Sequence, residues 1–187
     1  MTLSRLADIN DYEQIYHLIR SYDYIYGCEI TKSGIKDNII NCVSDVLNKK
    51  VNAAIAITLK DDELTGFGIQ LFYPEHWVVF LVMMKWKNFN PKNQEHGGII
   101  LNTLVDNAEL LGYRKFYWAS REENNQRYRR LNHVLKVSNI NERYLIETLE
   151  IIPPMTLSKY EIVNKGLLCD VAGKNTKLIA IRQGTKK

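Results

Sequence analysis

The spacing of apolar residues at the start of the chain predicts a short strand followed by two amphipathic helices. Residues 3–7 are typical of a strand, and Asp8 or Asn10 can cap the helix that follows. After a tyrosine-rich connection, Thr31 or Ser33 can cap the second helix. The apolar positions that recur at helical spacing are Ile15, Leu18, Ile19 and Tyr22 in the first helix, and Ile35, Ile39, Cys42, Val43 and Val46 in the second.

The period of the pattern then changes to two, which indicates strands. Residues 51–59 alternate between apolar and other side chains, and an acidic turn over residues 60–63 separates them from a second strand over residues 64–73. Residues 76–84 form a nearly continuous apolar run, as expected of a strand that is buried on both faces. A polar loop over residues 85–96 follows.

The second half of the chain predicts a helix, a strand, another helix and two strands. Gly97 and Gly98 open an amphipathic helix, and Gly112 closes it. The later elements are a strand over residues 114–120, a helix that begins at residues 121–124, and strands over residues 143–152 and 177–182. The last strand either completes the sheet or pairs across a dimer. The whole order is β-α-α-β-β-β-α-β-α-β, with one more strand at the end.

Composition narrows the class of protein. The 187 residues suit one domain, and 45% hydrophobic with 25% charged residues is ordinary for a globular chain. The net charge of +4 is compatible with an anionic ligand but too small to indicate nucleic-acid binding. The three cysteines are widely spaced, which predicts reduced thiols in the cytoplasm. The apolar run at residues 77–84 is far too short to cross a membrane.

The glycine pair is the first candidate for binding chemistry. Gly97 and Gly98 stand at the predicted start of a helix, after the apolar strand. Glycines allow a ligand to approach the backbone closely, and the free amides and the helix dipole favour an anion such as a pyrophosphate. The other interpretation, which remains open, is that the pair only caps the helix and relieves a tight loop.

The order of elements resembles the GCN5-related N-acetyltransferase (GNAT) superfamily. The opening Leu3-Ser4-Arg5-Leu6-Ala7-Asp8 looks like the family's usual first strand, and the resemblance covers about residues 3–152. It implies an α+β fold with a mixed, mostly antiparallel central sheet flanked by helices on both faces. It also implies a single GNAT-like domain over residues 1–187, with its core at residues 3–152 and a C-terminal extension at residues 153–187.

The resemblance implies a site for acetyl-CoA as cosubstrate. In the family, a splayed strand pairs with the pantetheine arm, which here assigns Val82, Met83 and Met84. The pyrophosphate turn has two possible registers. If Gln94 leads, Gly97 fits but Ile99 replaces the last small residue. If Lys92 leads, Gly97 takes the last position and Glu95 replaces a glycine, and we prefer this register because it keeps the usual helix length. Gly98 completes the glycine pair.

The family's catalytic residues carry over less directly. Asn124, or its neighbour Asn125, matches an asparagine that often contacts the pantetheine arm, although an ordinary helix cap explains it equally well. In the family, a tyrosine seven residues after this asparagine usually serves as the general acid. At that position this chain has Leu131, counted from Asn124, or Asn132, counted from Asn125. Tyr128, one turn earlier, is the substitute candidate for the general acid.

A general base is also hard to identify. Residues 76–84 contain no carboxylate, so Glu29 in the tyrosine-rich connection is the candidate, where a carboxylate among aromatic residues would suit a cationic amine. The scattered histidines and cysteines match no metal site. Two hypotheses follow: an N-acyltransferase that uses acetyl-CoA to modify an amine of a small molecule or a protein, and a non-catalytic binding or assembly protein on the same fold.

Overall fold

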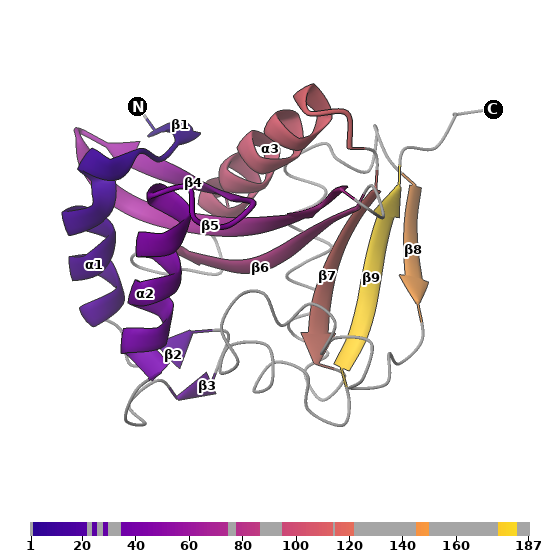
Figure 1. The fold of residues 1–187 in the computed structure, drawn as a ribbon, viewed down its shortest axis with the longest axis horizontal. Helices are drawn as coiled ribbons and strands as arrows, with labels where there is room; N and C mark the ends of the chain where they lie inside the picture. The colour runs from indigo at the N-terminus through magenta and orange to yellow at the C-terminus, as the bar shows by residue number, and fades with distance from the viewer. Residues whose placement is uncertain are drawn as a thin grey trace.

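The computed structural model describes residues 2–21, 24–25, 28–29, 35–74, 78–86, 95–113, 115–121, 145–149 and 176–182. Within them, a central sheet contains the strands β1 (Thr2–Leu6), β4 (Ala53–Lys60), β5 (Glu63–Tyr73), β6 (Val78–Trp86), β7 (Lys115–Arg121), β8 (Leu145–Leu149) and β9 (Thr176–Arg182). The α-helices are α1 (Tyr12–Arg20), α2 (Ile35–Leu47) and α3 (Glu95–Leu110). Figure 1 shows α1 and α2 on one side of the sheet and α3 on the other.

The sheet has the order β1-β4-β5-β6-β7-β9-β8. Its pairs are antiparallel, except that β6 and β7 are parallel and are connected through α3. This confirms the predicted mixed, mostly antiparallel sheet with helices on both faces. The strand predicted over residues 177–182 corresponds to β9, which lies between β7 and β8 in the sheet.

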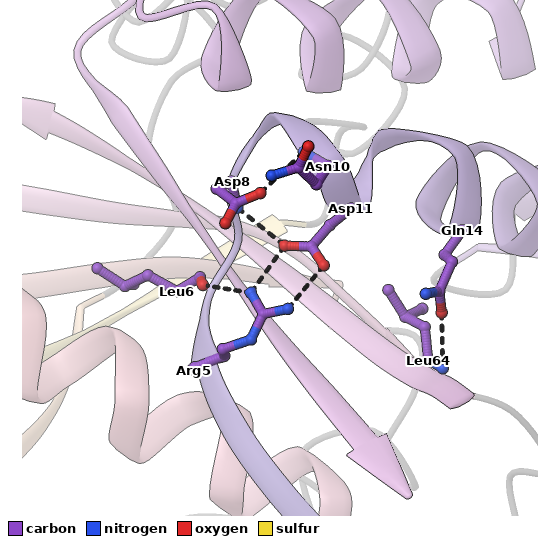
Figure 2. A network of polar contacts seen from close by, with 7 residues as sticks. All are labelled: Arg5, Leu6, Asp8, Asn10, Asp11, Gln14 and Leu64. Atoms are coloured by element: carbon purple, nitrogen blue, oxygen red, sulfur yellow. Dashed lines mark hydrogen bonds and ion pairs between the residues drawn. The ribbon is translucent and has the colours of Figure 1, made fainter. Parts of the chain in front are cut away.

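The chain turns from β1 into α1 through a single 3-10 turn, η1 (Ile9–Asp11). Of the two predicted caps, Asp8 is the one used. Its side chain accepts a hydrogen bond from the Asn10 amide, while the Asp11 carboxylate accepts one from the Asp8 amide (Figure 2). This reciprocal capping box satisfies two amides that a helix start leaves without partners. The predicted helix therefore begins in the expected place.

The connection between α1 and α2 contains a small hairpin that the sequence pattern did not predict. Its strands β2 (Tyr24–Ile25) and β3 (Cys28–Glu29) are only two residues long, too short to show any periodicity. The β4–β5 hairpin, in contrast, was predicted by its acidic turn. Asp61 and Asp62 have φ angles of 52° and 62°, as a two-residue type I′ turn requires.

Alternation along β1 assigns the two faces of the sheet. The Thr103 hydroxyl of α3 donates to Ser4 Oγ over 2.7 Å, so Ser4 faces α3. Arg5, the next residue, binds Asp11 at the start of α1 and faces the opposite side. The register places Ser4 beside Thr58 and Thr58 beside Gly66. The same alternation puts Gly68, Gln70 and Phe72 on the α3 face of β5.

The main hydrophobic core lies on the α1 and α2 face. It joins the predicted apolar positions of both helices to β4 and β5, and its fully buried members include Phe67 and Ile57. The predicted stripes are confirmed by burial of Ile15, Leu18, Ile19, Ile39, Cys42, Val43 and Val46. Tyr22 lies outside the described residues, and for Ile35 only the backbone is described. On the other face, α3 packs across β1, β4, β5 and β6 through Ile100, Leu101, Leu104, Val105 and Ala108.

Gly112 closes the C-terminal end of α3, as predicted. The Gly112 amide donates to the Glu109 carbonyl and the Tyr113 amide to the Ala108 carbonyl, which together form a Schellman motif. Gly112 has a φ of 90°, a conformation that only glycine adopts without strain. Tyr113 is buried, and its ring lies 5.1 Å from that of Phe72. The motif thus fixes where the chain leaves α3 for β7.

Candidate functional site

The point where β6 and β7 separate is the main irregularity of the sheet. Their parallel pairing covers only residues 78–81 of β6 and 115–118 of β7, and it ends with the pair Leu81 and Trp118. Beyond that pair, β6 continues to Trp86 on one course and β7 to Arg121 on another. Figure 1 shows the two ribbons adjacent at their starts and then diverging. Among the strands that the structure describes, none therefore pairs with the backbone of β6 from Val82 onward on its β7 side.

A β-bulge in β6 coincides with the separation. Met83 pairs with Ile69 of β5, but Leu81 pairs with Gln70, so Val82 is an extra residue without a partner in β5. A bulge bends its strand and increases the local twist. This bend accounts for the departure of β6 from β7 immediately after Leu81. The residues predicted to lie near a splay, Val82, Met83 and Met84, occupy this segment, and their role in binding a cofactor stays a prediction.

The first turn of α3 contains the glycine pair. The helix begins two residues earlier than predicted, at Glu95, so Gly97 and Gly98 are its third and fourth residues. The Gly97 amide therefore belongs to the group that has no partner inside the helix. Both glycines are buried. Packing against the rest of the protein can explain their lack of side chains, and this keeps open the interpretation of the pair as structural.

The boundaries of the loop before α3 also differ from the prediction. Lys85 and Trp86 belong to β6, and Glu95 and His96 belong to α3, so the expected loop at residues 85–96 is shorter at both ends. The strand continues because Gly66 and Phe67 of β5 still offer partners to its last two residues. The predicted pyrophosphate residues Lys92 and Gln94 lie outside the described residues.

Of the other predicted site residues, the structure describes Glu29 and does not describe Tyr128, Asn124 and Asn125. Glu29, the candidate base, belongs to β3, where its backbone pairs with that of Tyr24. Tyr128, the candidate acid, and Asn124 and Asn125, the candidate pantetheine contacts, lie outside the described residues. The structure therefore describes part of the predicted site, namely the residues that belong to β6, α3 and the β2–β3 hairpin. Of the two candidate catalytic residues, it describes only Glu29.

One polar residue near the separation point was missed by the sequence reasoning. Gln70 lies on the α3 face of β5, in the row that pairs with Leu81, and only 1% of its surface is exposed. Its Nε2 has no hydrogen-bond partner among the described residues. Along β5, Gly66, Gly68, Gln70 and Phe72 share the α3 face, and Gln70 is the only one of these four with a long polar side chain. A glutamine among small and apolar residues on one face of a strand was the signal available in the sequence.

The electrostatics of the described residues centre on Asp11. Burial disfavours its charged form, but hydrogen bonds from Arg5 and from the Asp8 amide, together with the charge of Arg5, outweigh burial and lower the pKa of the Asp11 carboxyl. The two Arg5 nitrogens lie 2.7 and 2.8 Å from the two carboxylate oxygens (Figure 2). This pair holds β1 to the start of α1. Its role is structural, because the other contacts of the pair also go to nearby backbone, from Arg5 to the Leu6 carbonyl and from the Asp8 amide to Asp11.

Other chemistry finds little support in the described residues. Burial raises the pKa of the Cys42 thiol to about 12, so this cysteine is a packing residue and no nucleophile at neutral pH. No cluster of three or more histidine, cysteine, aspartate or glutamate residues in the described part of the chain could hold a metal ion. Among the described helices, none is long and apolar enough to span a membrane.

Solved structures with the same fold cover almost the whole chain. A GNAT-family acetyltransferase from Staphylococcus aureus Mu50 superposes with a TM-score of 0.62 at 8% identity, over 98% of this chain and 99% of that one. The PaiA N-acetyltransferase from Thermoplasma acidophilum, solved in complex with coenzyme A, gives 0.59 at 12% identity, over 98% and 99%. The alanine N-acetyltransferase of a ribosomal protein from Escherichia coli gives 0.58 at 10% identity, over 100% and 97%.

No protein-family model and no curated protein sequence matches the chain. The likeness is therefore one of structure, at identities too low to carry activity from one protein to another. The chain has the GNAT fold, as the resemblance in its sequence implied. The bulge and the separation of β6 and β7 are the features of this fold on which a binding site can be argued.

Proposed function

We propose that this chain is an N-acyltransferase that uses acetyl-CoA to acetylate an amine of a small molecule or a protein. The observation that carries the proposal is the coincidence of the Val82 bulge with the end of the β6–β7 pairing. An extended ligand arm carrying amide groups can add to such an unpaired strand edge by main-chain hydrogen bonds. The pantetheine arm of CoA has this character, and Val82, Met83 and Met84 would receive it.

The same segment suits acyl transfer. The amine nitrogen would attack the thioester carbonyl, the carbon–sulfur bond would break, the amine would lose a proton to a base, and the departing thiolate would take up a proton from an acid. A backbone amide of β6 beyond the bulge would stabilise the negative charge on the carbonyl oxygen, and binding both substrates together would supply much of the rate enhancement. In this proposal Glu29 receives the proton of the amine and Tyr128 donates to the thiolate, with Asn124 or Asn125 contacting the arm.

The pyrophosphate would lie against the start of α3. Lys92 and Gln94 precede the helix, and Gly97 contributes one of the amides without an intrahelical partner. Among proteins of the same fold, the PaiA acetyltransferase was solved with coenzyme A. The net charge of +4 is also compatible with a ligand that carries several phosphate charges.

A specific observation favours the second candidate, a non-catalytic binding or assembly protein on this fold. Gly97 and Gly98 are buried, so close packing of α3 is a sufficient reason for both glycines. The tyrosine position seven residues after Asn124 holds Leu131, which cannot donate a proton. In this alternative, the bulge would be retained as part of the scaffold or as a docking edge for another partner.

Binding of CoA separates the two candidates. We expect CoA at about one hundred times its dissociation constant to raise the free energy of unfolding by about 2.7 kcal/mol. Thermal unfolding with CoA, with acetyl-CoA and with ATP as the anionic control would measure this. An equal response to ATP, or no response at millimolar CoA, would sink the enzyme proposal. If CoA binds, release of free thiol from acetyl-CoA in the presence of amines and N-terminal peptides would identify the acceptor class.

Variants should avoid the buried glycines. Gly97→Glu would place a charged side chain where the backbone is buried, so loss of binding would be confounded with loss of packing. Lys92→Ala and Asn124→Ala are cleaner, because alanine truncates a side chain without adding bulk. We expect each to weaken CoA binding about tenfold, as for removal of one charge-assisted or polar contact. Lys50→Ala, an exposed lysine that pairs with Asp45, is the matched control.

A further inference from the structure

Gln70 is buried on the face of the sheet that α3 covers. Only 1% of its surface is exposed, yet its Nε2 has no hydrogen-bond partner in the part of the chain that the structure describes. A buried donor without an acceptor loses its hydrogen bonds to water and gains nothing in return. Leucine or methionine would fill the same volume without that penalty. A polar group at this position therefore points to an acceptor other than those it contacts in the described part of the chain.

The pairing register puts Gln70 at the separation point. Gln70 lies opposite Leu81 of β6, and Leu81 lies opposite Trp118 of β7, so the three residues form one row across the sheet. This is the last row in which β6 and β7 are paired, and the bulged Val82 comes next. Gln70 is thus one strand away from the edge that we propose as the CoA site.

The neighbouring elements limit what can satisfy the amide. The side chains of β6 are valine, phenylalanine, leucine, methionine, lysine and tryptophan, which offer no oxygen acceptor. A second buried atom without a partner in the described residues, Asn102 Oδ1, belongs to α3. Successive residues of an α-helix are rotated by about 100° around the helix axis. Asn102 therefore lies about 100° around the axis from buried Leu101 in one direction, and Thr103 lies about 160° from it in the other. Since Thr103 contacts β1, Asn102 is on the flank toward β6.

We propose that Gln70 is a positioning residue for CoA, with its Nε2 donating a hydrogen bond to an amide carbonyl of the pantetheine arm. This inference rests on the proposed function, because it needs the arm to lie along β6 beyond the bulge. The arm contains two amides, each with a carbonyl acceptor and an N–H donor. Asn102 Oδ1, on the adjoining flank of α3, is a hydrogen-bond acceptor, and an amide N–H of the same arm is a matching donor.

Gln70→Met tests the proposal, since methionine has nearly the same length and no polar head. We expect the dissociation constant for CoA to rise about tenfold, the effect of one lost hydrogen bond in a buried site. In the absence of CoA, the melting temperature should rise by about 2–4 °C, because an unpaired donor is removed. Binding of adenosine 3′,5′-bisphosphate, which lacks the pantetheine arm, should be unchanged.

Thr58→Val is the matched control on the same face of the sheet. Thr58 is fully buried, but its hydroxyl accepts from Thr65, so this variant removes a group that has its partner. It should lower the melting temperature and leave CoA binding unchanged. If Gln70→Met behaves like Thr58→Val, Gln70 is structural and the inference is overturned. If the wild-type protein does not bind CoA at all, the proposed function fails first, and the melting temperature of Gln70→Met still reports whether the amide is paired.

Discussion

The two faces of the sheet differ in how their polar groups are paired. On the α1 and α2 face, Arg5 and Asp11 bind each other through two hydrogen bonds, and Gln14 of α1 accepts from the Leu64 amide over 3.1 Å (Figure 2). On the α3 face, Gln70 Nε2 and Asn102 Oδ1 are buried without a partner in the described residues. The polar groups named on the first face bind partners within the chain, whereas Gln70 Nε2 and Asn102 Oδ1 on the second face can still form hydrogen bonds.

Unpaired buried groups mark the face of this fold that is suited to binding a ligand. A face whose polar groups satisfy one another contributes to stability, since each contact lowers the free energy of the folded chain alone. A face with unsatisfied buried groups is less stable than it could be, and that loss is recovered only when a ligand supplies the partners. Substitutions on the two faces should therefore have opposite signatures in stability and in binding.

The largest effect is expected from Phe67→Ala on the α1 and α2 face. Phe67 is fully buried in the core cluster, so its truncation loses transfer free energy and leaves a cavity. We expect the free energy of unfolding to fall by about 3–5 kcal/mol, measured by urea denaturation. Leu110→Ala is the control, because Leu110 is 87% exposed and its truncation should change stability by less than about 0.5 kcal/mol. Equal effects would mean that the cluster is not the stabilising core.

Asp11→Asn should have the next largest effect. The Asp11 carboxylate accepts from both Arg5 nitrogens and from the Asp8 amide, and only 4% of the residue is exposed. An asparagine offers one oxygen instead of two and leaves Arg5 without its counter-charge, so we expect a loss of about 2 kcal/mol in urea denaturation at neutral pH. Glu13→Gln, at a site where 76% of the side chain is exposed, should have almost no effect.

The stability difference between wild type and Asp11→Asn should depend on pH. Because the pKa of Asp11 is lowered in the folded state, its carboxylate stabilises the fold at pH values above the ordinary aspartate pKa of about 4. This contribution should decline below about pH 4, as the unfolded chain takes up the proton first, and disappear below the folded-state pKa. Urea denaturation of both proteins from neutral to acid pH would measure it. A difference independent of pH would contradict the assignment.

The sequence predicted the fold better than the site, for physical reasons. Apolar periodicity reports which face of an element is buried, so both helical stripes could be predicted from the chain. In β4, in contrast, residues 55–58 are all buried although the sequence alternates, because helices cover both faces of the sheet. The two-residue strands of the β2–β3 hairpin are too short to show a period. The bulge at Val82 and the place of Gln70 beside it depend on the register between strands, which no local pattern determines. The resemblance to a known fold pointed to Val82, but not to Gln70.

The smallest effect is expected from Ser4→Ala, a substitution on the α3 face of β1. Ser4 and Arg5 are neighbours on β1 that face opposite sides of the sheet. The Thr103 hydroxyl lies 2.7 Å from Ser4 Oγ, but it also lies 3.1 Å from the Ile99 carbonyl, so it keeps an acceptor when serine is removed. We therefore expect a loss of about 0.5 kcal/mol in urea denaturation, at the low end for a hydrogen bond. The Asp11→Asn variant, which breaks the contact of the next residue along β1, should cost several times more. If the two variants were equally destabilising, polar pairing would support both faces alike, and the spare groups beside α3 would lose their significance as a mark of function.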